Sequence, residues 1–341
     1  PFRRRDDDKL YHRWPQARWE RSIQRMKKSY EIDMCNGPLL GKILVFSIPL
    51  MLSGILQLLF NAADIIVVGR FAGSTALAAV GSTASLINLM INVFVGLSVG
   101  VNVLAARYYG AQKEKDIQDT VHTAIMMAIL SGLFLVVLGE SASKPMLTLM
   151  GTPDDVINLS TLYMRIYFLG MPFFMLYNYG AAVLRAVGDT KRPLMFLIAA
   201  GIINACLNMV LVIVFNLGVA GVAIATIFSQ FISCVLVLRC LNKTDASYQL
   251  RFSKLKIKGY YLKQIFQVGI PAGIQSTVIN FSNALLQSSV NSFGSTAMAG
   301  YTAANNILGF LYASINSVTQ ACMSFTSQNY GVRKFKRMDK V

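Results

Sequence analysis

The sequence predicts an all-α protein that crosses a membrane several times, and three observations predict it. Hydrophobic residues make up 54% of the 341 residues and charged residues only 14%, with a mean hydropathy of +0.50, outside the range of soluble proteins. The apolar residues form long continuous runs, whereas a β-barrel has short alternating segments. Lys and Arg lie almost entirely in every second connection between these runs.

Eight apolar runs are long enough to cross a bilayer as helices. A spanning helix needs about 20 residues to cover about 30 Å of hydrocarbon. Short polar turns separate the runs, as in a helical bundle that passes back and forth through the membrane. The predicted spans cover residues 43–69, 79–104, 119–140, 159–184, 194–216, 219–240, 264–292 and 298–329.

The distribution of Lys and Arg predicts which side of the membrane each connection faces. With the N-terminus in the cytoplasm, 29 of the 32 lie inside, and Arg70, Lys144 and Arg165 are the three that lie outside. This split follows the positive-inside rule and predicts a multi-pass protein of a bacterial inner (plasma) membrane with a cytoplasmic N-terminus. The net charge of +16 therefore indicates the lipid bilayer as a partner, and nucleic acid is not expected to bind.

Composition and spacing divide the chain into four parts. Residues 1–42 form a predicted cytoplasmic tail, and the charge-dense residues 1–25 are typical of a tag or upstream read-through. Residues 43–241 hold the first six spans. Residues 242–263 form a basic cytoplasmic linker, interpreted as a solvated loop that faces lipid, and residues 264–341 hold two further spans.

An internal repeat relates the first two spans to the last two. Six spans separate the copies, so both copies cross in the same direction and the repeat is parallel. This predicts two pseudo-symmetric six-helix bundles, of which the second holds two helices here. Prolines 49, 172 and 271 each predict a bend, because proline removes a backbone hydrogen bond. The recurring residues, displaced by 222, 222 and 221 positions, are Ile48-Pro49 with Ile270-Pro271, Asn61 with Asn283, and Tyr109-Gly110 with Tyr330-Gly331.

Of the sixteen acidic residues, fifteen lie in the tails, loops or helix ends, and Asp64 is the exception. An ionised carboxylate without a partner is expensive in hydrocarbon, so a functional reason is favoured. Burial favours the protonated form and a bound cation favours the charged form, so a proton and a cation compete for the same group. The alternative is a carboxylate that neighbouring polar groups satisfy, or one near enough to the outer surface to stay wet.

Polar residues of two other spans are the expected partners of Asp64. Asn204 and Asn208 are four residues apart and share one helix face, and Thr226 adds a hydroxyl from the next span. Amide and carboxylate oxygens are suitable ligands for a small hard cation, so Asp64, Asn204, Asn208 and Thr226 form a candidate site for H⁺ or Na⁺. Taken alone, Asn pairs in spans more often hydrogen-bond between helices.

Uncharged amides are numerous in the predicted spans, and aromatic and Met residues crowd the fourth span. The amides favour a wet central cavity, and the aromatic and thioether groups suit flat apolar cations. For each aromatic residue, ordinary packing or lipid contact is an equally good interpretation. The candidate cavity residues are Gln57, Asn61, Tyr167, Met171, Asn178, Gln275 and Asn283.

Motifs for enzymatic chemistry are absent from the sequence. It contains no GxxxxGK[ST], GxSxG or HExxH, and its five Cys and two His show no metal-ligand spacing. We therefore expect no enzyme activity, no catalytic residue, no cofactor beyond the coupling ion and no obligate protein partner. Transport of small molecules would draw on an ion gradient.

Four segments together resemble the multidrug and toxic compound extrusion (MATE) family. They are Ile48-Pro49, the stretch DIIVVG at 64–69, RAVGDTKRP at 185–193 and GVAGVAIAT at 218–226. The resemblance implies twelve helices in two bundles, alternating access, and export of cationic or amphiphilic compounds against inward Na⁺ or H⁺. It also implies that the last four helices are missing, so the chain is expected to be C-terminally truncated.

The resemblance also implies roles for individual residues. Asp64 matches the family's first-helix acid, and Asn204 and Thr226 match polar members of the same site. Asn208 departs from the pattern, because relatives often carry Asp there, and Ile279 stands where some relatives carry a second acid. Both departures favour coupling through the first bundle, as in the DinF-like branch.

Two other functions remain as alternatives. A lipid-linked precursor flippase of the same superfamily would have this topology, but several basic residues would be expected in its cavity, and the spans hold almost no Lys or Arg. A membrane receptor or scaffold would leave Asp64 without an explanation.

Overall fold

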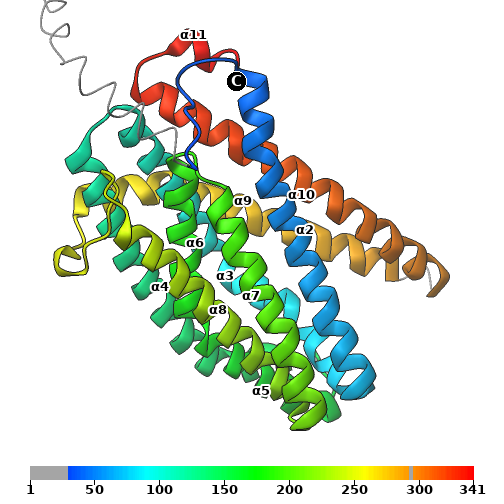
Figure 1. The fold of residues 1–341 in the computed structure, drawn as a ribbon. Helices are drawn as coiled ribbons and strands as arrows, with labels where there is room; N and C mark the ends of the chain where they lie inside the picture. The colour runs from blue at the N-terminus through cyan, green and yellow to red at the C-terminus, as the bar shows by residue number, and fades with distance from the viewer. Residues whose placement is uncertain (1–29, 292–294) are drawn as a thin grey trace, which may run out of the picture.

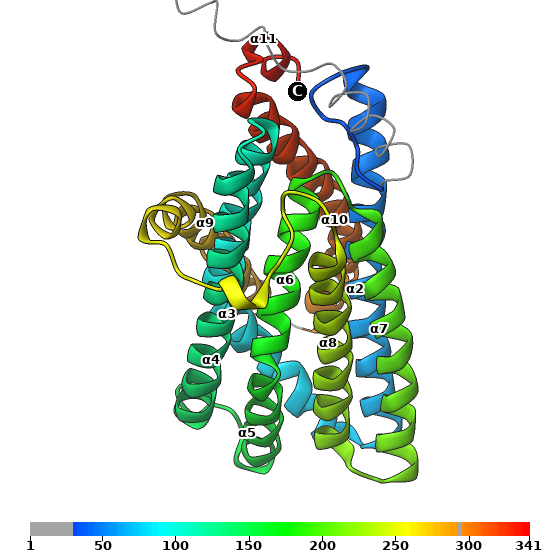
Figure 2. The same ribbon diagram turned by 60° about the vertical axis from the view of Figure 1, so that its left-hand side comes forward.

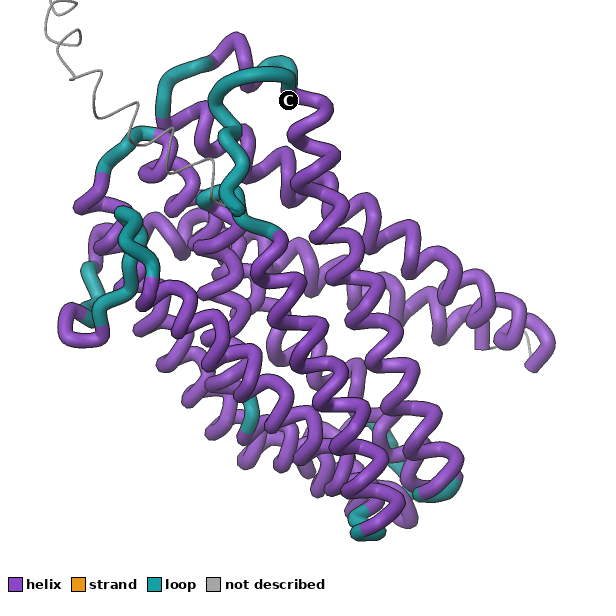
Figure 3. The backbone as a smooth tube through the Cα atoms, in the orientation of Figure 1, coloured by secondary structure: helices purple, strands orange, loops and turns teal. Residues whose placement is uncertain are grey.

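The structure, a computed structural model, describes residues 30–291 and 295–341, so the prediction for residues 1–25 lies outside it. The described residues form helices and contain no strand (Figure 3). Connections between the long helices are short, except for the loop between α8 and α9. The helices are α2 (Leu39–Phe71), α3 (Ser74–Gly110), α4 (Glu114–Leu149), α5 (Asp154–Leu169), α6 (Met171–Ala186), α7 (Lys191–Met209), the π-helix η1 (Val210–Val214), α8 (Gly218–Lys243), the 3₁₀-helix η2 (Phe252–Lys254), α9 (Gly259–Asn291), α10 (Ser295–Gly331) and α11 (Phe335–Met338).

The described parts of all eight predicted spans lie in helices, except for Gly170, Phe215 and Asn216. Five helices or helix pairs of the described chain, α2, α3, α4, α7 with η1, and α8, are long and apolar enough to cross a membrane. Helices α5 and α6 are long and apolar enough only when taken together, with a bend of 48° between them. Helices α9 and α10 are long enough, at 33 and 37 residues, but Ser, Asn and Gln occur throughout them and make them more polar. The protein is therefore an all-α, multi-pass membrane protein.

The three prolines act differently. The chain bends between α5 and α6 at Gly170, and Pro172 is in the first turn of α6, where a missing N–H does no harm. Helix α2 runs through Pro49 and α9 runs through Pro271 without a break. The predicted interruption therefore ends a helix only in the fourth span.

Helices α2–α8 form the main bundle (Figures 1 and 2). Its two ends differ in the charge of their connections. The turns 111–113 and 187–190, the loop 244–258 and residues 332–341 lie at the end where α2 begins, which we call the basic end. Arg70, Lys144 and Arg165 lie near the opposite end, where Arg165 forms an ion pair of 3.6 Å with Glu140. Each helix runs along the full length of the bundle, so successive connections lie at alternate ends. Basic and neutral connections alternate along the chain for this reason.

Helices α9 and α10 pack against α3 and α2 toward the basic end and diverge from the main bundle toward the opposite end (Figure 1). We call this contact the seam. Glycines let the backbones touch there: a Cβ at Gly96 of α3 would lie 2.9 Å from the Gly269 carbonyl oxygen of α9. A Cβ at Gly273 of α9 would lie 2.8 Å from the Cα of Val93. On the other side, the rings of Phe46 in α2 and Phe325 in α10 meet edge to face.

Candidate functional site

Helices α2, α7 and α8 bring the four predicted site residues together in one hydrogen-bonded chain. The Asn208 amide nitrogen donates to Oδ1 of Asp64 and, over 3.2 Å, to Oδ1 of Asn204. The Asn204 amide nitrogen in turn donates to the Thr226 hydroxyl over 3.5 Å. Among the described residues, no Lys or Arg forms an ion pair with Asp64.

Close contact between α2 and α7 explains why Asp64 reaches Asn208. Gly201 lies on α7 against the ring of Phe60 of α2, and any Cβ at position 201 would overlap that ring. Asp64 follows Phe60 by one turn, and Asn204 and Asn208 follow Gly201 by one and two turns, so these groups align along the same contact. Asn204 and Asn208 are buried, and Asp64 is half-buried.

Directly beyond Asn208, α7 changes into the π-helix η1, in which the Phe215 N–H donates to the Val210 carbonyl over 3.1 Å. Such π-helical turns are rare and occur frequently at functional sites. The sequence analysis did not predict this turn, because the stretch VLVIV carries no local signal for it. The wider turn moves the end of α7 relative to an ideal helix just after the candidate site.

One buried acceptor of the site has no partner. Oδ1 of Asn208 is inaccessible and makes no hydrogen bond among the described residues. An unpaired buried acceptor costs about 1–3 kcal/mol. The oxygens of Asp64, Asn204, Asn208 and Thr226 are all hard ligands and fit a small monovalent cation or a proton. Within the described part of the chain, no group of three His, Cys, Asp or Glu could hold another metal.

Three further residues belong near this site. Tyr163 and Tyr167 of α5 are four residues apart, stack with 5.9 Å between ring centroids, and lie close enough to interact electrostatically with Asp64. Gln230 follows Thr226 by one turn of α8, and its buried side-chain oxygen lies beside the Tyr167 hydroxyl. The sequence analysis named Tyr167 but not Tyr163 or Gln230 as candidates. Tyr163 is four residues from Tyr167, and Gln230 is four residues from Thr226. This spacing places each on the helix face of a named candidate and could have identified it.

The amides predicted to line a cavity on α2 and α9 are exposed. Asn61 and Gln57 share a face of α2 with Asp64, because they precede it by one and two helical turns. Gln275 and Asn283 are exposed along α9. Their exposure is compatible with the predicted wet surface between the bundles, which stays a prediction.

Two other predicted cavity residues have different roles. Met171 is fully buried in the apolar core with Phe168 and Met175, so the prediction that it lines an open cavity is wrong. It packs where α6 begins, because Gly132 of α4 allows the helices to approach there. Asn178 is half-buried and donates its amide to the Phe174 carbonyl of its own helix over 2.8 Å.

Comparison with known proteins gives one consistent family. The family model MatE matches residues 49–210 and 271–341. The "Probable multidrug resistance protein YoeA" of Bacillus subtilis is 33% identical over 306 residues, which cover 87% of this chain and 66% of that protein. The "Probable multidrug resistance protein YpnP" of the same species is 29% identical and is covered to 68%. This chain thus spans about two thirds of the length of these relatives.

A solved structure of a MOP superfamily transporter from Pyrococcus furiosus has the same fold. It superposes with a TM-score of 0.83 at 25% identity, over 90% of this chain and 68% of that one.

Proposed function

Because the chain belongs to the MatE family of transporters, we propose that it exports cationic or amphiphilic small molecules in exchange for H⁺ or Na⁺. The observation that carries this proposal is the hydrogen-bonded group of Asp64, Asn208, Asn204 and Thr226, with one buried oxygen left unpaired. A lone carboxylate among hard oxygen ligands inside an apolar bundle is the composition expected of a coupling-ion site.

The charge asymmetry of the bundle supports an orientation. The basic end would face the cytoplasm of a bacterial inner membrane, with the chain's N-terminal side inside. Since α9 and α10 close on α2 and α3 at the basic end and diverge at the other, this conformation would be open toward the outside (Figure 1). An ion arriving from outside could then reach Asp64, which is half-buried in the outer part of α2.

The Asn208 amide gives the site two states. With its NH₂ toward Asp64, as here, the amide stabilises an ionised carboxylate without a cation. A half-turn of the amide would bring its unpaired oxygen beside Asp64 and complete an oxygen cage for Na⁺. A proton on Asp64 would remove the charge instead. In either case the site loses its net negative charge, and the contact between α2 and α7 changes.

Antiport requires that ion and substrate weaken each other's binding, and this coupling is reciprocal. The stacked Tyr163 and Tyr167 beside Asp64 support substrates with a flat, positively charged surface, since such rings attract cations. The names of the two Bacillus relatives, both of which print multidrug resistance, support drug-like small molecules as the cargo. A substrate cation and the coupling ion would compete for one negative charge.

Ethidium efflux from vesicles that contain the protein tests the proposal, with Na⁺ and pH gradients imposed separately. We expect one gradient to drive efflux and Asp64→Asn to reduce it by at least about tenfold, because the loss of a charge-assisted contact corresponds to about 1.4 kcal/mol or more. Glu140→Gln is the matched control, since it neutralises an acidic residue that pairs with Arg165 away from the site. Full gradient-driven efflux by the Asp64→Asn protein would refute the role of Asp64.

A further inference from the structure

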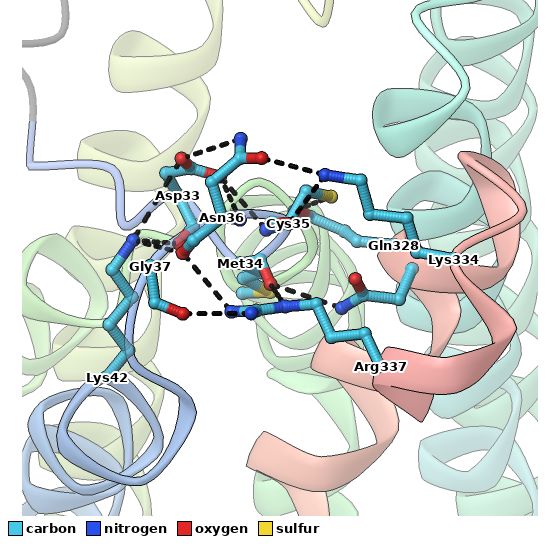
Figure 4. Close-up of polar contacts among 10 residues, drawn as sticks. Asp33, Met34, Cys35, Asn36, Gly37, Lys42, Gln328, Lys334 and Arg337 are labelled. Atoms are coloured by element: carbon cyan, nitrogen blue, oxygen red, sulfur yellow. Dashed lines mark hydrogen bonds and ion pairs between the residues drawn. The ribbon is translucent and has the colours of Figure 1, made fainter. Parts of the chain in front are cut away.

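A short segment before α2, residues 31–37, bonds both to the main bundle and to the chain after α10 at the basic end, and we call it the strap; Figure 4 shows its part from Asp33 to Gly37. Its first residues bind the main bundle. The Glu31 carboxylate accepts hydrogen bonds from the hydroxyls of Tyr109 in α3, at 2.8 Å, and Tyr248 in the loop after α8, at 2.6 Å. The Ile32 N–H donates to the Gly188 carbonyl over 3.1 Å.

The later residues of the strap bind α10 and the segment that follows it. Two cations, Lys334 and Arg337, donate to strap oxygens, and the amide of Asn329 adds another bond (Figure 4). Five of these bonds end on backbone carbonyls and one on the Asn36 side chain. The pairs are Asn329 to Met34 O at 3.1 Å, Lys334 to Cys35 O at 2.9 Å and to Asn36 Oδ1 at 2.7 Å, and Arg337 to Gly37 O at 2.8 Å, to Asn36 O at 3.1 Å and to Met34 O at 3.3 Å.

The strap holds its own shape, so its carbonyls are presented in a fixed arrangement. The Asp33 carboxylate accepts from the backbone N–H groups of Cys35, at 2.9 Å, and Asn36, at 3.2 Å. Lys42 of α2 donates to the carbonyls of Asp33 and Asn36, at 2.7 Å each. Gly37 closes the turn with a φ of +74°, which favours glycine.

The bonds of the strap differ in how far water reaches them. Tyr248 is fully buried, and burial, followed by the charge of Glu31, raises the pKa of its hydroxyl, so it remains a donor. Lys334 is exposed and Arg337 half-buried, and their bonds compete with water. The bond from Asn329 to Met34 O is buried, so Lys334 and Arg337 supply the bonds on the α10 side that water can reach.

Opening the basic end requires α10 to move away from α3. The strap is bonded both to α3 and to α10 with the segment that follows it. Inside the seam, the Ser324 hydroxyl of α10 donates to Oδ1 of Asn102 in α3 over 3.0 Å, and both side chains are buried. These groups become accessible from the basic end only when the seam parts. Ser324 therefore reports the state of the seam.

We propose that the strap is a latch that holds the basic end closed, and that release of Lys334 and Arg337 from its carbonyls controls how readily the seam opens. The inference rests on the proposed transport function, in which both ends must open alternately. It assigns to these two cations a positioning role in the transport cycle, without contact with the transported molecule.

Labelling of a single cysteine tests the latch. Ser324→Cys is introduced into the protein with its five cysteines replaced by alanine, which keeps the backbone groups of position 35. A membrane-impermeant maleimide is added on the side of the basic end, in inside-out vesicles. Combining Lys334→Gln with Arg337→Gln should raise the labelling rate about tenfold, as expected when several exposed charge-assisted bonds are lost. The control pair Lys336→Gln and Lys340→Gln removes the same charge from side chains that make no bond to the described residues, and should leave the rate unchanged.

A second pair of substitutions tests the bonds between the strap and the main bundle. Tyr109→Phe with Tyr248→Phe removes the two hydroxyls on Glu31 but keeps the rings packed, and should also raise the labelling rate. The latch is refuted if neither pair changes the rate, or if the control pair raises it equally. Labelling needs neither substrate nor gradient, so this outcome is independent of ethidium efflux: the Asp64→Asn result can overturn the transport proposal while the labelling result stands.

Discussion

Substituting Gly331 by alanine should open the seam, because two glycines cross there reciprocally. A Cβ at Gly331 of α10 would lie 2.9 Å from the Ala111 N and closer still to the Arg107 carbonyl, against 3.4–4 Å for an ordinary contact. A Cβ at Gly110 of α3 would meet the Gln328 backbone in the same way, with its carbonyl carbon at 2.9 Å. Arg107 and Gly110 are displaced from Gln328 and Gly331 by 221 positions, the interval of the sequence repeat.

The expected magnitude follows from the rigidity of what the methyl group meets. Backbone atoms cannot rotate away, so the helices must separate, and overpacking of this kind costs about 1–3 kcal/mol. The added methyl group destabilises the closed seam by this amount and does not destabilise the open seam. The ratio of open to closed protein should therefore rise by about 5-fold to 140-fold, at about 1.4 kcal/mol per factor of ten.

The Ser324→Cys labelling rate measures this ratio for Gly331→Ala, Gly110→Ala and the double variant. The double variant should cost less than the sum of the single variants, because either methyl group already separates the helices. Gly81→Ala is the control: nothing lies within 4 Å of a Cβ there, and alanine favours the helix. Unchanged labelling in Gly331→Ala, or full additivity in the double variant, would refute the reciprocal crossing.

Two further substitutions separate the site from the core. Asn208→Ala should lower ethidium efflux by at least about tenfold with little loss of folded protein. The reason is that Asp64 loses its hydrogen-bond donor and the site loses an oxygen ligand. Efflux equal to that of the unmodified protein would contradict this role. Met171→Ala should do the reverse: a fully buried Met truncated to Ala costs about 2–5 kcal/mol, so the thermal unfolding midpoint should fall while efflux per folded protein is kept. An unchanged midpoint would contradict the burial of Met171.

Much of the fold could be predicted because its signals are local. Apolar runs of span length coincide with the helices, and the connections rich in Lys and Arg gather at the basic end. The site was predictable for a related reason: a carboxylate, a pair of Asn at four-residue spacing and a hydroxyl are conspicuous inside apolar helices. The bonds from Asn208 to Asp64 and from Asn204 to Thr226 bring these groups together, and their role in ion coupling stays a prediction.

Other features depend on contacts between distant segments and give no local signal. Met171 and the exposed Gln275 both lie in predicted spans, and only packing of α6 against α4 decides that one is core. The π-helix after Asn208 arises in a run of Val, Leu and Ile that suits any helix. The strap is a polar stretch whose partners Lys334 and Arg337 are about 300 positions away, so sequence spacing could not join them.

Helix α2 links the candidate site to the latch. It carries Asp64 against α7 near one end, packs Phe46 against Phe325 of α10 near the other, and continues directly from the strap. A helix of 33 residues is about 50 Å of continuous hydrogen-bonded backbone, so a shift of α2 at Asp64 is transmitted to the seam. If ion binding favours one state of the seam, the state of the seam must change ion affinity by the same factor. Releasing the strap through Lys334 and Arg337 should therefore shift the ion concentration at which efflux is half-maximal, whereas a strap that only stabilises the fold would leave that concentration unchanged.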